Sequence, residues 1–348
     1  MNRLIKALKQ ERNQRLLYPL IALAAILLFN LFFTRGFLHL EIKNGHLFGS
    51  LIDILNRGAP MMLITIGMTL VYATGGVDLS VGAVIAISGA LAAQIIRPGY
   101  VQGILEYPEQ QALILVIGIP LALSVLLGLW NGFLVAFVGV QPIIATLILM
   151  TAGRGIAQLI TRGQIIVFEH PPFQHIGSGF LFAMPFPIVL VMLMCAITWA
   201  LTRKTAMGTL IEALGANATA SRYMGIQVRW IKMSVYGFSG FCAGLAGLII
   251  CADIKAADAN NAGLFLELDA IASVIIGGTI NGGRFSLAGS IIGALIIQAL
   301  STTIMTRGVP PQVVLVFKAI IIILVALIQS PRIRNRIMST VKTKKKAA

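Results

Sequence analysis

The sequence is dominated by long runs of apolar residues, most of them about as long as a helix must be to cross a lipid bilayer. A transmembrane helix needs about 20 consecutive, mainly apolar residues. By that measure the chain contains ten candidate segments, at residues 17–33, 52–74, 81–97, 112–138, 143–161, 185–202, 233–252, 270–280, 286–306 and 312–329. We therefore predict an all-α fold, a polytopic membrane helix bundle of about ten transmembrane segments that includes short or broken helices.

The composition supports a membrane protein and argues against a nucleic-acid-binding protein. Hydrophobic residues make up 57% of the 348 residues and charged residues only 11%, whereas soluble proteins have about a quarter of their residues charged. The net charge of +15 comes from the two ends and one central loop, where membrane topology already accounts for it. Cys195, Cys242 and Cys251 lie in or at the ends of apolar runs without metal-ligand spacing, so we expect them to be packing residues.

Basic residues gather in the segments that would face the cytoplasm. Residues 1–15, loop 203–232 and the tail from Arg332 to Lys346 are all strongly basic, whereas loop 253–269 carries four acidic residues and one lysine. Short cytoplasmic loops are enriched in Lys and Arg, and ten crossings place all three basic segments on the same side. We therefore expect both termini in the cytoplasm and loop 253–269 outside.

We divide the chain into a basic cytoplasmic N-terminus (1–16), a transmembrane domain (17–330) and a basic cytoplasmic tail (331–348). No small-residue cleavage site follows the first apolar run, so we expect that run to be a retained helix and not a signal peptide.

Several of the predicted segments are interrupted. The second contains Arg57 and Pro60, and the eighth is too short to cross the bilayer alone. Irregular backbone at membrane depth is tolerated where it is buried in protein or lines a cavity, so these segments are candidates for a solute pathway. The segments at 17–33, 185–202 and 312–329 lack such features, and we expect them at the periphery, facing lipid.

Two pairs of glycines have the spacing that lets helices approach closely. They are Gly240 with Gly244 and Gly289 with Gly293. Small residues four apart allow close helix contact, and we expect both pairs to serve ordinary bundle packing.

An acidic residue interrupts the apolar sequence between the second and third segments, within the run Ala73–Gly82. A carboxylate at membrane depth is costly unless it faces water or a partner, which makes Asp78 a functional candidate. The alternative is structural, because Asp78-Leu-Ser80 also resembles a helix N-cap in which Ser80 accepts from free N–H groups. A second glycine-rich break, Gly277–Phe285, is a candidate for a broken helix near the same pathway.

Two further charged residues lie within predicted spans. Arg154, in the fifth, needs a carboxylate or water nearby, and Asp78 is one possible partner. Lys318, in the last, is expected to extend its ammonium group to the membrane surface. The candidates for a translocation pathway are Asp78, Ser80, Asn131, Arg154 and Asn281.

The predicted outer loop is acidic and rich in amides. Its candidates for receiving a polar solute or a soluble partner are Asp258, Asn260, Asn261 and Glu267, although solvated loops often have this composition. His170 and His175 lie five apart without the Cys or Glu ligands of a metal site, so we expect no metal.

Loop 203–232 is the largest internal segment outside the membrane. Thr209–Ala213 can form a short helix, and Gly215, Asn217 and Gly225 mark turns after it. A short helix there would suit a docking element for a soluble partner, and an ordinary solvated loop is the alternative. The sequence lacks the G-x-x-x-x-G-K-[ST] phosphate-binding motif, so any ATP-driven activity would need another chain to hydrolyse the nucleotide.

Three stretches together resemble the membrane subunits of ribose-type sugar ABC importers. They are Gly75–Gly82, Gly208–Gly225, and Glu267–Gly278 followed by Gly282-Gly283. The resemblance covers residues from about 50 to 330. Finer features are most similar to the permeases of bacterial galactofuranose importers, namely Ile54–Arg57, Ile143–Met150 with Gly153-Arg154-Gly155, and Ala257–Gly263.

The resemblance implies a permease without catalysis of its own and with no bound cofactor. Its expected partners are a second permease, homologous or identical, a cytoplasmic ABC ATPase that uses ATP and Mg, and a periplasmic sugar-binding protein. Within loop 203–232, the residues implied to couple to the ATPase are Glu212, Ala213, Gly215, Asn217 and Gly225. Leu214 departs from the Glu-Ala-Ala of the coupling signature in other importers, so contacts from those importers are not transferred here.

The alternative function that the residues leave open is a proton-coupled secondary transporter that uses Asp78, with Arg154 as a possible partner. A membrane enzyme that uses His170 and His175 has no nucleophile or metal-ligand set in the sequence to support it. Under the importer hypothesis the chain lies in the bacterial inner membrane and carries a monosaccharide, galactofuranose or a related sugar.

Overall fold

The computed structural model describes residues 2–34, 36–43, 45–96, 109–310, 313–320 and 323. The helices are α1 Asn2–Phe33, α2 Ser50–Ala73, α3 Val81–Ile96, α4 Glu109–Phe133, α5 Pro142–Thr161, α6 Pro171–Ser178, α7 Phe186–Arg203, α8 Met207–Ala216, α9 Ala218–Tyr223, α10 Val228–Ile254, α11 Leu266–Ile276 and α12 Leu287–Met305. A π-helical turn, Leu134–Val138, follows α4, and residues 313–320 are helical. The predicted basic tail, 331–348, lies outside the described residues.

Within the part of the chain that the structure describes, six short strands form three separate two-stranded antiparallel pairs. β1 (Glu41–Lys43) pairs with β2 (His46–Phe48), β3 (Ile166–Val167) with β6 (Ala256–Ala257), and β4 (Phe180–Leu181) with β5 (Met184–Pro185). Because β3 follows α5 and β6 follows α10, their pairing joins the ends of two helices that are distant in the sequence.

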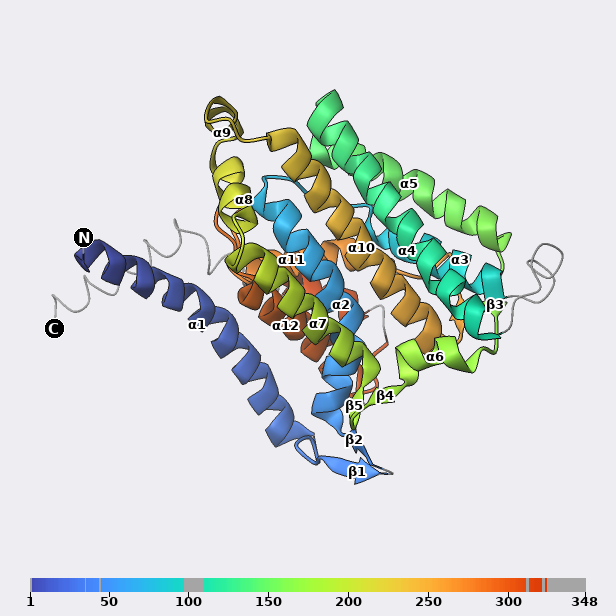
Figure 1. Cartoon of the computed structure of the whole chain (residues 1–348). Helices are drawn as coiled ribbons and strands as arrows, with labels where there is room; N and C mark the ends of the chain where they lie inside the picture. Colours follow the sequence, from blue (N-terminus) through green and yellow to red (C-terminus); the bar gives the residue numbers. More distant parts are fainter. Residues whose placement is uncertain are drawn as a thin grey trace, which may run out of the picture.

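The helices form one bundle, in agreement with the predicted all-α membrane fold (Figure 1). Within the described residues, seven helices are long and apolar enough to cross a membrane. The first nine predicted segments each overlap a helix, α1 to α5, α7, and α10 to α12. The tenth is described only at 313–320 and 323. The largest differences in the boundaries are three: α1 continues without a break into the basic N-terminus, α10 begins at Val228 within the predicted loop 203–232, and α11 spans Leu266–Ile276 instead of 270–280.

Helix α2 occupies the middle of the bundle. Its side chains Leu63, Ile64 and Ile66 are fully buried, and α2 packs against α7, α10, α11 and α12. Helix α1 lies at one edge and α5 at the opposite edge (Figure 1). Only 11% of the apolar window of α1 and 33% of that of α7 are buried, so both are peripheral, as predicted.

The two ends of the bundle carry different structures. Helices α8 and α9 lie at one end, and strands β1, β2, β4 and β5 lie at the other (Figure 1). We call these the inner end and the outer end, because the basic loop 203–232 that contains α8 and α9 is expected in the cytoplasm.

Glycines allow α10 to approach its neighbours closely. A Cβ on Gly240 would overlap the carbonyl oxygen of Ser124 in α4, and one on Gly128 would overlap that of Tyr236 in α10. In the same way, Gly289 and Gly293 of α12 face the carbonyl oxygens of Gly277 and Ser273. The helix-packing function predicted for both glycine pairs is confirmed.

We expect Gly128→Val to lower the free energy of unfolding by about 3 kcal/mol, since the added methyl groups would push α4 away from α10. Thermal unfolding of the purified protein in detergent measures the effect. Gly118→Val on the same helix is the control, because no atom lies within 4 Å of a Cβ there. Equal midpoints for the two variants would contradict the close contact.

Candidate functional site

A buried carboxylate occupies the break between α2 and α3. Asp78 is 1% exposed, and both of its oxygens accept hydrogen bonds. Ser80 donates to Oδ1 through its backbone N (3.1 Å) and its Oγ (2.6 Å), and Ser239 of α10 donates to Oδ2 (2.8 Å). Several donors compensate the cost of removing a carboxylate from water. The break is therefore tied to α10 through Asp78.

Asn131 connects this carboxylate to α4. Its Nδ2 donates to Ser80 Oγ at 2.8 Å, and its Oδ1 is buried without a hydrogen-bond partner among the described residues. We call Asp78, Ser80, Asn131 and Ser239 the Asp78 network. Of the predicted pathway candidates, the structure brings Asp78, Ser80 and Asn131 together. The Ser80 hydroxyl bonds to Asp78 and Asn131, and these contacts take the place of the N-cap interaction considered from the sequence.

Arg154 has a different carboxylate neighbour from the one considered from the sequence. Its Nη1 donates to the carbonyl oxygen of Ala262, and its guanidinium interacts electrostatically with Glu267. Gly82 in the first turn of α3 lets these two side chains lie directly against that helix, since a Cβ there would overlap Glu267 Oε2 and lie 3.2 Å from Arg154 Nη2. Arg154 thus holds the segment before α11 against α5, whereas Asp78 belongs to its own network.

The outer-loop candidates divide into two groups. Asp258 forms a turn, since its Oδ1 accepts from the backbone N of Asn260 (3.0 Å) and Asn261 (3.2 Å). Asn260 Oδ1 then accepts from Gln158 Nε2 of α5 at 2.9 Å, which ties the loop to that helix. Glu267 differs from the expectation, because it is 1% exposed and points into the protein instead of lying on the outer surface.

At the inner end, the predicted short helix is longer than Thr209–Ala213 and is followed by a second one. Asn217 separates α8 from α9 and caps α9, its Oδ1 accepting from Ala220 N at 2.9 Å. After α9 the chain turns at Gly225, whose φ of 83° favours glycine. Tyr223 and Met224, beside this turn, are 88% and 80% exposed.

Helix α8 is packed directly onto the end of α2. A Cβ on Gly215 would overlap the carbonyl oxygen of Ala73 and the backbone N of Gly283. The backbone N of Gly283 donates to that same Ala73 oxygen (2.8 Å), and Gly282 N donates to Tyr72 O (3.0 Å).

Three predicted site residues lie near this contact. Asn281, a predicted pathway candidate, is exposed in the loop that contains Gly282 and Gly283, at the inner end. Glu212 is half-buried and Ala213 exposed on α8.

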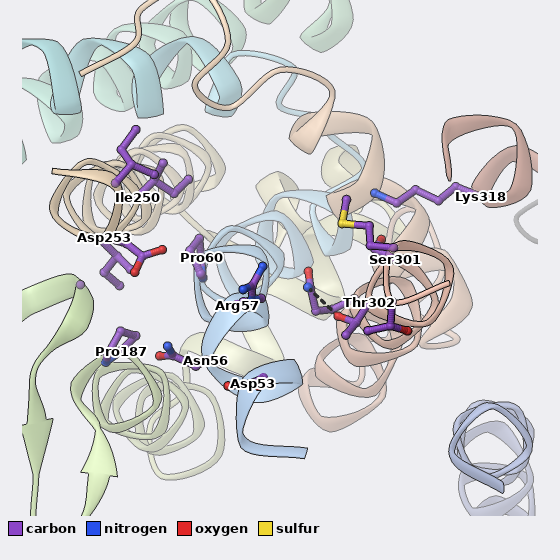
Figure 2. Close-up of a pocket in the computed structure, with 16 residues that line it drawn as sticks. Asp53, Asn56, Arg57, Pro60, Pro187, Ile250, Asp253, Ser301, Thr302 and Lys318 are labelled. Carbon is purple, nitrogen blue, oxygen red and sulfur yellow. Dashed lines mark hydrogen bonds between the residues drawn. The ribbon is translucent and has the colours of Figure 1, made fainter. Parts of the chain in front are cut away.

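A cavity of about 530 Å³ with both apolar and polar walls lies at the outer end, lined by α2, α6, α7, α10, α12 and residues 313–320. Figure 2 shows Arg57 of α2 between Asp253 of α10 and Thr302 of α12. We call this the outer cavity. The sequence interpretation noted Arg57 and Pro60 only as irregularities of a span. The sequence did contain a signal for a polar site on α12. Gln298, Ser301 and Thr302 have the i, i+3, i+4 spacing that places polar side chains on one face of a helix.

Lys318 borders the outer cavity, and the prediction that it reaches the membrane surface is wrong. Its Nζ lies 2.6 Å from Asp269 Oδ2 of α11, and the two side chains are only 16% and 12% exposed. An ammonium group in this position is stabilised better by a fixed carboxylate than by distant water. This ion pair ties the helical residues 313–320 to α11.

The two histidines have structural contacts. His170 caps α6, its Nδ1 accepting from Phe173 N at 3.1 Å, and the His175 ring lies against Phe186. In the described part of the chain, no three His, Cys, Asp or Glu side chains are grouped so that they could hold a metal ion.

Comparison with known proteins identifies relatives over most of the chain. Residues 50–326 match the family described as "Branched-chain amino acid transport system / permease component". The galactofuranose transporter permease protein YtfT of Escherichia coli K12 is 49% identical, with 90% of this chain and 89% of the relative covered. The fructose import permease protein FruF of Bifidobacterium longum is 39% identical (94% and 91% covered). The ribose import permease protein RbsC of E. coli K12 is 36% identical (81% and 86% covered). No solved structure matches the chain significantly.

We expect Asp78→Ala to destabilise the protein by about 3 kcal/mol, because it leaves the buried hydroxyls of Ser80 and Ser239 without their acceptor. Ser239→Ala removes one donor and should cost about 1 kcal/mol. Thermal unfolding in detergent measures both. The control is Glu41→Ala, which removes an exposed ion pair with Lys43 and should have almost no effect. An Asp78→Ala protein as stable as the control would rule out the Asp78 network as a structural tie.

A double-mutant cycle tests the ion pair between Lys318 and Asp269. We expect Lys318→Met and Asp269→Asn each to cost about 3 kcal/mol, because each leaves one charge buried without its partner. The double variant should regain much of that loss, since neither charge remains. Unfolding midpoints of the four proteins give the coupling energy. Strictly additive losses would show that the two charges do not stabilise each other.

Proposed function

The chain belongs to the family of permease components described above, and from this premise we propose that it is the membrane permease of an ATP-binding cassette importer for a monosaccharide. The observation that carries the proposal is the 49% identity with a galactofuranose permease over nearly the full length of both chains. The fructose and ribose permeases among the relatives support a sugar as the solute class. We propose galactofuranose or a related sugar as the substrate and the bacterial inner membrane as the location.

We propose that the chain works with partner subunits that supply the energy and the solute. A cytoplasmic ABC ATPase would bind ATP and Mg, since this sequence has no phosphate-binding motif of its own. A second permease, homologous or identical, would complete the membrane unit, and a periplasmic sugar-binding protein would deliver the sugar.

We propose that α8 and α9 form the element that couples this permease to the ATPase. The exposed Tyr223 and Met224 project from the inner end, where a soluble partner has access. Gly215 has no side chain and lets α8 touch the carbonyl oxygen of Ala73 directly. A push on α8 would therefore reach both the end of α2 and the Gly282-Gly283 loop that precedes α12.

This arrangement supports alternating access as the transport mechanism. Helix α8, the end of α2 and the Gly282-Gly283 loop meet next to the break between α2 and α3. The Asp78 network ties that break to α4 and α10. Closure of the ATPase around ATP would move α8, and the movement would pass into the helices that surround the pathway. In this mechanism Asp78, Ser80, Asn131 and Arg154 position the helices along the pathway.

A proton-coupled secondary transporter is less well supported. Both oxygens of Asp78 already accept hydrogen bonds from serines, so a proton relay would have to break these contacts. The relatives named above are a transporter permease and two import permeases. An enzyme that uses His170 and His175 has no support from their positions either, because His170 caps a helix and His175 packs against Phe186.

Reconstitution of the whole importer tests the proposed function. The chain is co-expressed with the ATPase and second permease of its own system and placed in nanodiscs with the binding protein. We expect the ATPase to co-purify and its activity to rise when galactose, fructose or ribose is delivered. Accumulation of sugar against a gradient by the chain alone in proteoliposomes would overturn the proposal.

The contact with the ATPase can be tested separately. We expect the double substitution Tyr223→Ala and Met224→Ala to reduce ATPase co-purification about tenfold, because large exposed side chains often dominate binding energy. The control is Phe182→Ala, equally exposed (90%) but located between β4 and β5 at the outer end. Unchanged recovery of the ATPase with the double variant would exclude this surface as the docking site.

A further inference from the structure

The outer cavity has the properties of a solute-binding site that the comparisons do not assign. We propose that it holds one neutral, polyhydroxylated molecule, a monosaccharide under the proposed function on which this inference rests. Among the described residues, the walls of the cavity come from α2, α6, α7, α10, α12 and residues 313–320. Its volume of about 530 Å³ is within the usual range of small-molecule pockets.

The cavity offers both donors and acceptors of hydrogen bonds, as a sugar hydroxyl requires. Asn56 lines the cavity, and its Oδ1 is buried without a hydrogen-bond partner among the described residues, so rotation of the amide would turn a free acceptor toward a ligand. In α2, Pro60 lacks the backbone N–H that would bond to the carbonyl oxygen of Asn56, four residues earlier. That carbonyl oxygen is therefore a second acceptor in the same wall. On α12, Gln298 Nε2 and Thr302 Oγ1 share a long bond of 3.3 Å that a ligand hydroxyl can replace.

Each basic group at the cavity lies near a carboxylate, which leaves no free positive charge to attract an anion. Three carboxylates, Asp53, Asp253 and the Lys318 partner Asp269, face two basic groups, Arg57 and Lys318. Arg57 and Asp253 interact electrostatically across the cavity, and Lys318 is already paired with Asp269. The excess of carboxylates would repel an anion, whereas the hydroxyls of a neutral polyol would bond to both kinds of group.

Most of the surface that lines the cavity is apolar. Pro60, Pro187, Ile250 and Met305 line it beside the polar groups, and a sugar ring presents C–H faces that pack on such surfaces. A few oriented polar groups among apolar side chains are typical of a specific small-molecule site. The combination distinguishes the outer cavity from the apolar groove between α1 and α12, which is lined by Ile26, Phe29 and Phe317.

Cysteine protection tests the site without any need for ATP hydrolysis. Thr302→Cys is introduced into the complex with its second permease and ATPase, in nanodiscs and without the binding protein. We expect galactose, fructose or ribose to slow labelling of this cysteine by a membrane-impermeant thiol reagent severalfold. Ile42→Cys on β1, 69% exposed at the same end, is the control and should label at an unchanged rate. The parent protein, with its three native cysteines, gives the background.

Two further measurements make the test specific. Asn56→Leu should raise the sugar concentration for half-protection about tenfold, because it removes the free amide acceptor. Unchanged co-purification of the ATPase with this variant establishes that the bundle is intact. The sugar acid galacturonate should protect less well than galactose, because the carboxylates around the cavity outnumber the basic groups and would repel its negative charge. Equal or better protection by galacturonate would overturn the neutral-ligand assignment.

The possible outcomes separate this inference from the proposed function. If the full importer transports a sugar and that sugar does not protect Thr302→Cys at any concentration, the inference falls and the proposed function stands. If a sugar protects the cysteine but no ATPase co-purifies and the chain transports alone, the site stands and the importer proposal falls.

Discussion

The structure depends on how the end of α2 is completed. The last carbonyl oxygens of a helix have no partner within it and must find one elsewhere. Gly282 N and Gly283 N donate to those of Tyr72 and Ala73, and Gly215 brings α8 against the same carbonyl. Three segments that are far apart in the sequence therefore meet at one helix end. Because glycine is the only residue small enough for this approach, larger residues at position 215 would separate α8 from the bundle.

The membrane-embedded polar groups divide into those that are satisfied and those that are not. Asp78 and the ion pair of Lys318 with Asp269 have fixed partners, so they tie helices together at limited cost. Asn56 Oδ1 and Asn131 Oδ1 are buried without a partner among the described residues. An unsatisfied buried amide costs free energy, which suits a position where a solute or water completes the bond in part of the transport cycle.

Much of the fold was predictable from the sequence, because membrane spans are a local property. Hydropathy and length located the segments, and the shortness of α11 was visible as a span of too few apolar residues. The pairing of charges was not predictable, since it depends on which helices are neighbours. From the sequence, Glu267 is predicted in the outer loop and Lys318 at the membrane surface. In the structure, Glu267 interacts with Arg154 of α5, and Lys318 forms an ion pair with Asp269 of α11. The outer cavity is lined by residues from α2, α6, α7, α10, α12 and 313–320, and no local sequence pattern specifies that these segments converge.

Helix α2 connects the two ends where the proposals place function. Arg57 lines the outer cavity, and Ala73 contacts α8 about 24 Å away along the helix, at 1.5 Å per residue. The helix between them is almost wholly buried against its neighbours, so it moves as a packed body. Pro60 removes one backbone hydrogen bond next to the cavity, and helices bend most easily at such positions. A displacement of α8 at the inner end would therefore be absorbed mainly at Pro60, where a change in bend alters the wall of the outer cavity.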